Sequence, residues 1–295
     1  MMFGYLWLLA ACSPQSDNLA QRPVTSTFTI DVAPHYEQQT IKCDKRFVHK
    51  GQQWHIQQLA FFVSNMQYKM ADSEEWQALS FVTSPWQTEH TALIWYATGC
   101  DSDVAQEALD NKQENTQENT SLMLQSSEFE QAQAPVQMRF SLSVPFEYNH
   151  LNPLTQSSPL NNPSMFWSWR LGHKFLRLDI NSKQMQKQWS FHLGSLGCQS
   201  QSSLRPPEQP CSQPNRFEIT LNIDSQNQNS VLNFDLSALL ENIDMARMSP
   251  CMFDLSEQAS CALLLDNIQD KDIFSFAKRY HQPLIQVNKI EQALH

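Results

Sequence analysis

Short stretches of alternating polar and apolar residues run through the whole chain. Residues 26–32 read STFTIDV and residues 136–144 read VQMRFSLSV, each with a period of two. That period places every second side chain on one face of a strand, so these segments are typical of half-buried β-strands. We predict an all-β fold, an antiparallel β-sandwich or barrel-like structure with long loops and short helices. Further strands are predicted at residues 54–63, 66–70, 91–96, 165–169, 174–180, 189–193, 216–223 and 230–236, and a short helix at residues 261–268.

The segments between these strands are polar. Residues 110–120 read DNKQENTQENT and contain no apolar residue, which indicates a solvated loop. Residues 199–215 are rich in Ser, Gln and Pro and are also predicted to be a loop. Because no linker divides the chain near its midpoint, residues 26–295 are predicted to form a single domain.

The N-terminus has the features of an export signal. Residues 3–11 are apolar and end in Leu9-Ala10-Ala11, directly before Cys12. Such a run is too short to span a bilayer, and small residues at its end are typical of a cleavage site. Cys12 resembles the acylated cysteine of a bacterial lipobox, so we expect residues 1–11 to be a signal peptide and residues 12–25 a tether. The alternative is a buried apolar N-terminal strand.

These features predict an exported lipoprotein in the periplasm or at the outer membrane, attached to the membrane through its lipid alone. Cys12 is not followed by aspartate, which by analogy favours sorting to the outer membrane.

Seven cysteines are present, and the lipid anchor leaves six. An even number in an exported chain predicts disulfides, each typically contributing about 2–4 kcal/mol to stability. A zinc site is the weaker alternative, because the sequence has no CxxC pair. Proximity along the chain favours the pairs Cys198–Cys211 and Cys251–Cys261. The remaining two cysteines would then form Cys43–Cys100.

Composition argues against several classes of function. The chain has 30 acidic and 20 basic residues, a formal charge of −10 that repels nucleic acid backbones. It has only 6 glycines and neither a GxGxxG motif nor a P-loop, so nucleotide chemistry is not expected. No GxSxG elbow places a nucleophile, so an exported hydrolase is the least favoured hypothesis. We expect a protein that is not an enzyme.

A metal site is one of two interpretations of the segments that are rich in tryptophan and histidine, and composition alone favours the other, core packing. On a strand, Met165, Trp167 and Trp169 would share one face, near the imidazoles of His150 and His192. Thioether and imidazole groups suit a soft or borderline metal such as copper. The competing interpretation is that the tryptophans pack in the core and the histidines are hydrogen-bonded structural residues.

Several segments together resemble the MbnP family, methanobactin-associated periplasmic proteins. The resemblance extends from about residue 28 to residue 274. The matching segments are residues 59–65 (LAFFVSN), 144–150 (VPFEYNH), 159–162 (PLNN), 165–169 (MFWSW), 174–175 (KF), 191–198 (FHLGSLGC) and 214–216 (PNR), with Cys211, Cys251 and Cys261.

The resemblance implies an exported copper-binding protein that works with a di-haem, MauG-like peroxidase. That partner would oxidise a tryptophan to kynurenine, which would help to hold copper. Carried over to this chain, the ligands are His150 and His192, and the modified residue is Trp167 or Trp169. A second class of function stays open, a structural or adhesive β-sandwich lipoprotein without metal, and Trp54 beside His55 is an alternative site.

Overall fold

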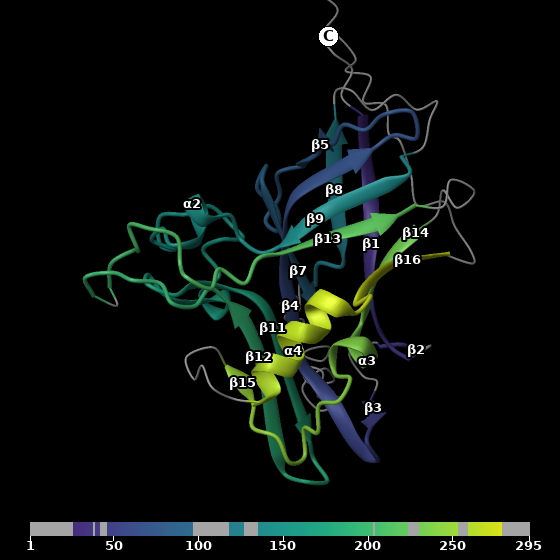
Figure 1. The fold of residues 1–295 in the computed structure, drawn as a ribbon, viewed down its shortest axis with the longest axis vertical. Helices are drawn as coiled ribbons and strands as arrows, with labels where there is room; N and C mark the ends of the chain where they lie inside the picture. The colour runs from purple at the N-terminus through teal and green to yellow at the C-terminus, as the bar shows by residue number, and fades with distance from the viewer. Residues whose placement is uncertain are drawn as a thin grey trace, which may run out of the picture.

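The computed structural model describes residues 26–37, 39–41, 46–96, 118–126, 135–202, 204–223, 230–252 and 259–278. Within these residues the chain forms two β-sheets and a few short helices (Figure 1). The expected signal peptide and tether, Cys12, Cys43, Cys100 and most of the QENT segment lie outside the described residues.

The smaller sheet has six strands within the described residues. Its order is β16 (Phe274–Lys278), β14 (Ser230–Asp235), β1 (Ser26–Tyr36), β8 (Ser121–Ser126) and β6 (Ser80–Phe81), and β2 (Gln39–Thr40) pairs with β1. The β1 strand alternates between buried and half-buried residues, as its sequence predicts. It pairs in parallel with β14, whereas its pairing with β8 is antiparallel.

The larger sheet has ten strands in the part of the chain that the structure describes. Its order is β13 (Phe217–Asn222), β9 (Gln137–Leu142), β4 (Gln52–Lys69), β11 (Gly172–Ser182), β12 (Lys187–Gly194) and β15 (Cys251–Met252). Four more strands pair with β4 or β11: β3 (Arg46–His49), β5 (Gln77–Ala78), β7 (Thr91–Tyr96) and β10 (Phe166–Ser168). The β12–β15 pair is parallel.

The long strand β4 replaces two strands that the sequence predicts at residues 54–63 and 66–70. The register against β9 shifts between Ser64 and Gln67, and Asn65 has a φ of 52°. An irregularity of this kind lets a strand bend and continue, because the extra residue is left out of the ladder. The polar residues around Asn65 therefore mark a bulge and not the end of a strand.

The two sheets pack face to face through aromatic side chains. Phe61 of β4 lies with its ring centroid 5.3 Å from that of Phe234 in β14 and 5.5 Å from that of Phe274 in β16. Phe140 of β9 lies 5.2 Å from Phe274. These residues are almost fully buried, so the core lies between the sheets. The structure confirms the predicted all-β, β-sandwich-like fold and adds two parallel strand pairs to it.

Short helices complete the described fold. They are α2 (Phe146–Asn149), the 3-10 helix Pro163–Met165, α3 (Leu236–Leu239) and α4 (Ala259–Asp270), which covers the predicted helix at residues 261–268. Among the described residues, there is no helix that is both long enough and apolar enough to span a membrane. The structure contains the disulfides Cys198–Cys211 and Cys251–Cys261, the two pairs that proximity favours.

Candidate metal site

Trp167 lies in the short strand β10, between a 3-10 helix and a turn. The 3-10 helix begins after Asn162, whose side chain accepts a hydrogen bond from the backbone of Ser164 at 3.0 Å. The Trp167 ring centroid is 6.4 Å from that of His192 in β12. A Cβ atom on Gly194 would lie 2.5 Å from Cζ3 of Trp167, so the indole fits only because position 194 has no side chain. The indole therefore packs on the face of β12 that carries His192.

The imidazole of His192 is oriented by a carboxylate on the neighbouring strand. Its Nε2 lies 2.8 Å from Oδ1 of Asp179, and Oδ2 of Asp179 accepts from Nε of Arg177 at 2.6 Å. Burial raises the pKa of Asp179, but hydrogen bonds from His192 and Ser190 and the charge of Arg177 hold it below its usual range. The ionised carboxylate accepts from Nε2–H, and no hydrogen bond to Nδ1 is found among the described residues. Nδ1 is therefore the nitrogen available to a ligand.

One cation lies over the indole and a second shares a hydrogen-bond acceptor with it. Nζ of Lys174 lies 6.0 Å from the centre of the Trp167 ring and donates to the carbonyl of Ser164 at 2.7 Å. Nη1 of Arg177 donates to the same carbonyl at 3.2 Å. Burial and the nearby charge of Arg177 lower the pKa of Lys174 to about 8. The surroundings of Trp167 are thus polar and charged, unlike the aromatic core between the sheets.

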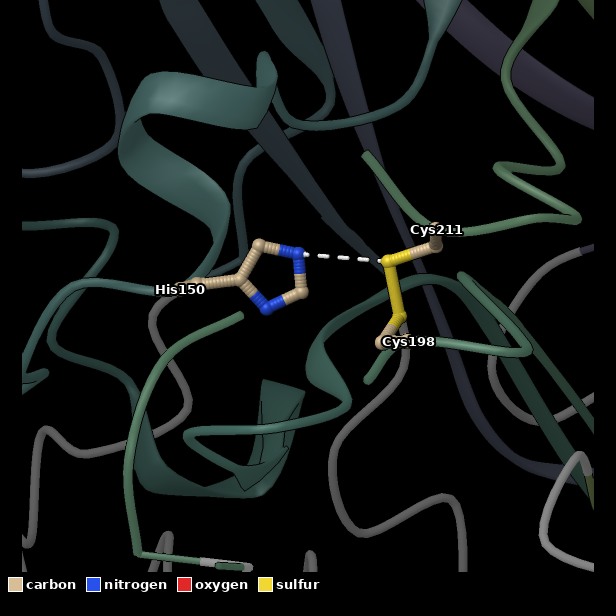
Figure 2. A group of neighbouring side chains, drawn as sticks. All are labelled: His150, Cys198 and Cys211. Atoms are coloured by element: carbon tan, nitrogen blue, oxygen red, sulfur yellow. Dashed lines mark hydrogen bonds between the residues drawn. A yellow bond between two sulfur atoms is a disulfide. The ribbon is translucent and has the colours of Figure 1, made fainter. Parts of the chain in front are cut away.

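His150 has a different set of neighbours. Figure 2 shows one edge of its imidazole directed at the Cys198–Cys211 disulfide, with Nε2 3.7 Å from Sγ of Cys211. Its Nδ1 lies 3.1 Å from the carbonyl of Trp169, and Nδ2 of Asn149 donates to Nε2 at 3.0 Å. Burial lowers the pKa of His150 to about 4, and the charge of Arg216 adds to this effect. The buried ring is therefore neutral at pH 7.

The amide of Asn149 fixes the tautomer of His150. Oδ1 of Asn149 accepts from the backbone N–H of His173 at 2.8 Å, so the amide nitrogen must face His150. Nε2 of His150 then accepts, and Nδ1 carries the proton that it donates to Trp169. His173 is itself buried, with Nδ1 and Nε2 each 2.9 Å from a carbonyl oxygen, of Asn149 and Leu160 respectively.

The structure thus separates the predicted residues into two groups. Trp167 contacts His192, and His150 contacts the disulfide. Within the described residues no hydrogen bond or ring contact joins His150 to His192 or to Trp167, and a metal shared by the two histidines stays a prediction. Trp169 follows β10 in a turn and is half-buried, and Met165 lies buried in the 3-10 helix, so the strand predicted at residues 165–169 is shorter at both ends. Trp54 is buried in the core.

Comparison with known proteins matches the MbnP family model to residues 25–253. The chain belongs to the MbnP family. The solved structure of MbnP from Methylosinus trichosporium superposes on this MbnP-family chain with a TM-score of 0.66. The match covers 86% of this chain and 98% of that one at 16% sequence identity, so the two share a fold. No curated protein sequence matches the chain.

Sequence reasoning missed Asp179, Lys174 and Asn149. Asp179 lies 13 residues before His192, and only the β11–β12 register brings the two together, with Arg177 opposite His192. Asn149 directly precedes His150 in the sequence, but the sequence does not indicate that its amide forms a hydrogen bond with the imidazole. All three residues lie within the part of the chain matched to the MbnP family.

Proposed function

We propose that this MbnP-family chain is an exported, lipid-anchored protein that binds copper and acts in copper handling, and that it is not an enzyme. The observation that carries the proposal is the contact between Trp167 and His192. An indole lies beside an imidazole whose Nε2 is held by Asp179 and whose Nδ1 is open. Carboxylate–imidazole pairs of this kind orient metal-ligating histidines in proteins.

The proposed copper site is built around this pair. Nδ1 of His192 would be one ligand, and a kynurenine formed from Trp167 would offer an aromatic amine and a ketone near it. Trp167 is the better candidate for modification than Trp169, because Trp167 contacts the imidazole whereas Trp169 contributes a backbone carbonyl to His150. His150 is retained as the second ligand predicted from the family resemblance.

The modification requires an oxidant, and we propose a di-haem, MauG-like peroxidase as its source. Two molecules of hydrogen peroxide would open the indole to N-formylkynurenine and leave two molecules of water. Hydrolysis would then release formate and leave kynurenine. The indole of Trp167 is half-buried, so its ring is within reach of a partner that docks on this face.

Two measurements test the proposal. Intact-mass spectrometry of protein co-expressed with the peroxidase should show the mass change expected when one tryptophan becomes kynurenine. The Trp167→Phe variant should not show this mass change. Competition against a coloured Cu(I) chelator should show weaker binding in His192→Ala. His90→Ala is the matched control, because His90 is exposed, stacks on Tyr148 and is not a proposed ligand. Copper affinity that is unchanged in both Trp167→Phe and His192→Ala would overturn the assignment.

A metal-free structural or adhesive lipoprotein is the second candidate. The charge of Lys174 beside Trp167, and that of Arg177 on Asp179, favour it, because positive charges oppose a cation in the same place. Metal analysis of protein purified without a histidine tag separates the two candidates. The lipid anchor is tested by fractionation, in which Cys12→Ser should move the protein from the membrane fraction to the soluble fraction.

A further inference from the structure

Three groups that bind soft metals converge at the disulfide beside α2. Nε2 of His150 and the Sγ atoms of Cys198 and Cys211 all lie within 4.8 Å of one another, and all three residues are buried (Figure 2). As a disulfide the two sulfur atoms are weak donors, whereas as thiolates they are strong ligands for soft and borderline metals. We propose that reduction of Cys198–Cys211 opens a metal site in which both thiolates and the His150 imidazole bind a thiophilic ion of the Zn²⁺ class.

The backbone around the cysteines keeps them adjacent without the sulfur–sulfur bond. Leu196 and Gln213 exchange backbone hydrogen bonds of 2.7 and 3.1 Å, two residues away from the cysteines on both strands of the loop. Oγ of Ser195 also donates to the carbonyl of Pro214 at 3.0 Å. Because these bonds do not depend on the disulfide, both thiols would remain within reach of one ion after reduction.

The imidazole is already in the form that a metal requires. Its Nδ1–H donates to the carbonyl of Trp169, and its Nε2 lone pair faces Cys211 and the amide of Asn149. Metal-ligating histidines commonly donate their second ring N–H to a backbone carbonyl in this way. An ion would have to displace one hydrogen bond only, the one that Asn149 donates to Nε2.

A nearby cation offsets the charge that two thiolates would bring into a buried place. Nε of Arg216 donates to the carbonyl of Val144 at 3.1 Å, while its Nη2 is buried and has no partner in the described part of the chain. Its charge acts on His150. Positive charge near a thiol stabilises the thiolate, so the charge that acts on His150 would also favour loss of the thiol protons when an ion binds.

The chemistry of the step balances with a dithiol as reductant. The Cys198–Cys211 bond breaks, its two sulfurs take up two electrons and two protons, and the dithiol closes to a cyclic disulfide. The incoming ion then displaces the two thiol protons. Two thiolates and one imidazole leave the fourth tetrahedral position to water, as in zinc sites with three protein ligands.

This site includes neither Trp167 nor His192, so it does not rest on the copper proposal. The two proposals do compete for one residue, His150. If His150 belongs to the copper site, His150→Ala should weaken copper binding by the oxidised protein. If it belongs to the cysteine site, the same variant should weaken metal binding by the reduced protein alone.

Cobalt(II) is the probe for the test, because thiolate ligands give it near-ultraviolet charge-transfer absorption that imidazole and carboxylate ligands do not. The full chain is reduced anaerobically with a dithiol, desalted and titrated with Co²⁺. We expect one equivalent to bind with thiolate charge-transfer bands, and Zn²⁺ to abolish them. The Cys198→Ser/Cys211→Ser variant should lose the bands, and His150→Ala should weaken binding about tenfold or more.

The second disulfide supplies the matched control. Cys251–Cys261 is also buried, but no histidine joins it in a potential metal cluster among the described residues. Cys251→Ser/Cys261→Ser and His192→Ala should keep the cobalt bands. Absence of the bands in reduced wild-type protein, or their persistence in Cys198→Ser/Cys211→Ser, would overturn the proposal, as would their loss in the Cys251→Ser/Cys261→Ser control.

A second measurement uses only the wild-type protein, so it does not depend on whether the cysteine variants fold. Reduced wild-type protein is alkylated with and without Zn²⁺, and the modified cysteines are located by mass spectrometry. Zn²⁺ should protect Cys198 and Cys211 selectively and leave the alkylation of Cys251 and Cys261 unchanged. Equal protection of both pairs, or of neither, would contradict the proposed site.

Discussion

The Nε2 atom of His192 lies 2.8 Å from Oδ1 of Asp179, in a pair that joins strands β12 and β11. Arg177 occupies the other carboxylate oxygen at 2.6 Å. The carboxylate is therefore fixed from both sides and sets the direction in which the imidazole presents Nδ1. Asp179 acts here as a positioning residue, because it touches the proposed ligand and not the proposed copper ion.

The first prediction is that Asp179→Asn weakens copper binding through His192. The amide can accept from Nε2–H, but it carries no charge, so the imidazole is held less firmly and is a weaker base. Loss of such a partner typically costs about 10–100-fold in metal affinity. Competition with a Cu(I) chelator measures the change, and the d–d absorption band of the protein loaded with Cu²⁺ should shift.

The control for Asp179→Asn is Glu74→Gln, which also removes an ion-paired carboxylate. Glu74 accepts from Nζ of Lys69 at 2.8 Å and is exposed. Solvent screens an ion pair as exposed as this one, so neither stability nor copper affinity should change measurably in this variant. Equal copper affinity in wild type and Asp179→Asn would remove the positioning role.

The second prediction concerns the close approach of Trp167 to Gly194. A Cβ at position 194 would lie 2.5 Å from Cζ3 of Trp167 and 2.9 Å from the carbonyl oxygen of His173. Gly194→Ala should therefore cost about 1–3 kcal/mol of stability through overpacking. Urea denaturation followed by far-UV circular dichroism measures the loss.

A double-mutant cycle isolates the part of this cost that belongs to the indole. Phenylalanine at position 167 lacks the fused six-membered ring, so Gly194→Ala should cost less in a Trp167→Phe background. We expect a coupling of about 1 kcal/mol between the two positions. Additive effects would show that the clash with the backbone of His173 dominates and that the indole is free to move.

The sequence predicted the strands better than their connections. Alternation alone locates β1 and β9, because one face of each strand is buried. The parallel pairing of β1 with β14 joins Val32 to Leu232 and has no local signature. The polar residues around Asn65 in β4 are equally consistent with a bulge and with a turn, because a bulge and a turn both place polar residues between apolar ones.

The candidate site was predictable in some of its residues and not in its geometry. Trp167 and His192 were predicted from the residue pattern and from the family resemblance, and the structure places them in contact. The register between β11 and β12 brings Asp179 next to His192. The loop between β12 and β13 carries the disulfide that lies beside His150. Both depend on pairing between distant segments, which a single sequence does not specify.

The third prediction is a pH dependence that arises from His49. Nε2 of His49 donates to the carbonyl of Ile243 at 2.7 Å, so Nδ1 accepts from the hydroxyl of Tyr36 at 2.9 Å. Burial lowers the pKa of His49 below 6.5, so the unfolded chain binds the proton more readily than the folded one. Stability from this group is present above pH 6.5 and is lost as the pH falls through the lowered pKa.

The measurement is the difference in unfolding free energy between pH 7.5 and pH 5 in wild type and His49→Gln. Other buried histidines and the carboxylates contribute to both proteins, so only the difference between the two slopes reports on His49. The variant should lose less stability on acidification, even where it is less stable at pH 7.5. If the unfolding free energies of the two proteins changed equally with pH, the protonation of His49 would not be coupled to folding.

The fourth prediction concerns Phe274, whose ring lies between the two sheets. It is 2% exposed, and its centroid lies 5.2 Å from that of Phe140 in the larger sheet and 5.2 Å from that of Phe234 in the smaller one. Phe274→Ala should lower the free energy of unfolding by about 3–5 kcal/mol, because it opens a cavity that neither sheet can fill. Phe276→Ala is the control on the same strand, since Phe276 is half-buried and should cost less. The urea midpoints of the two variants measure the difference, and equal losses would mean that Phe274 does not hold the sheets together.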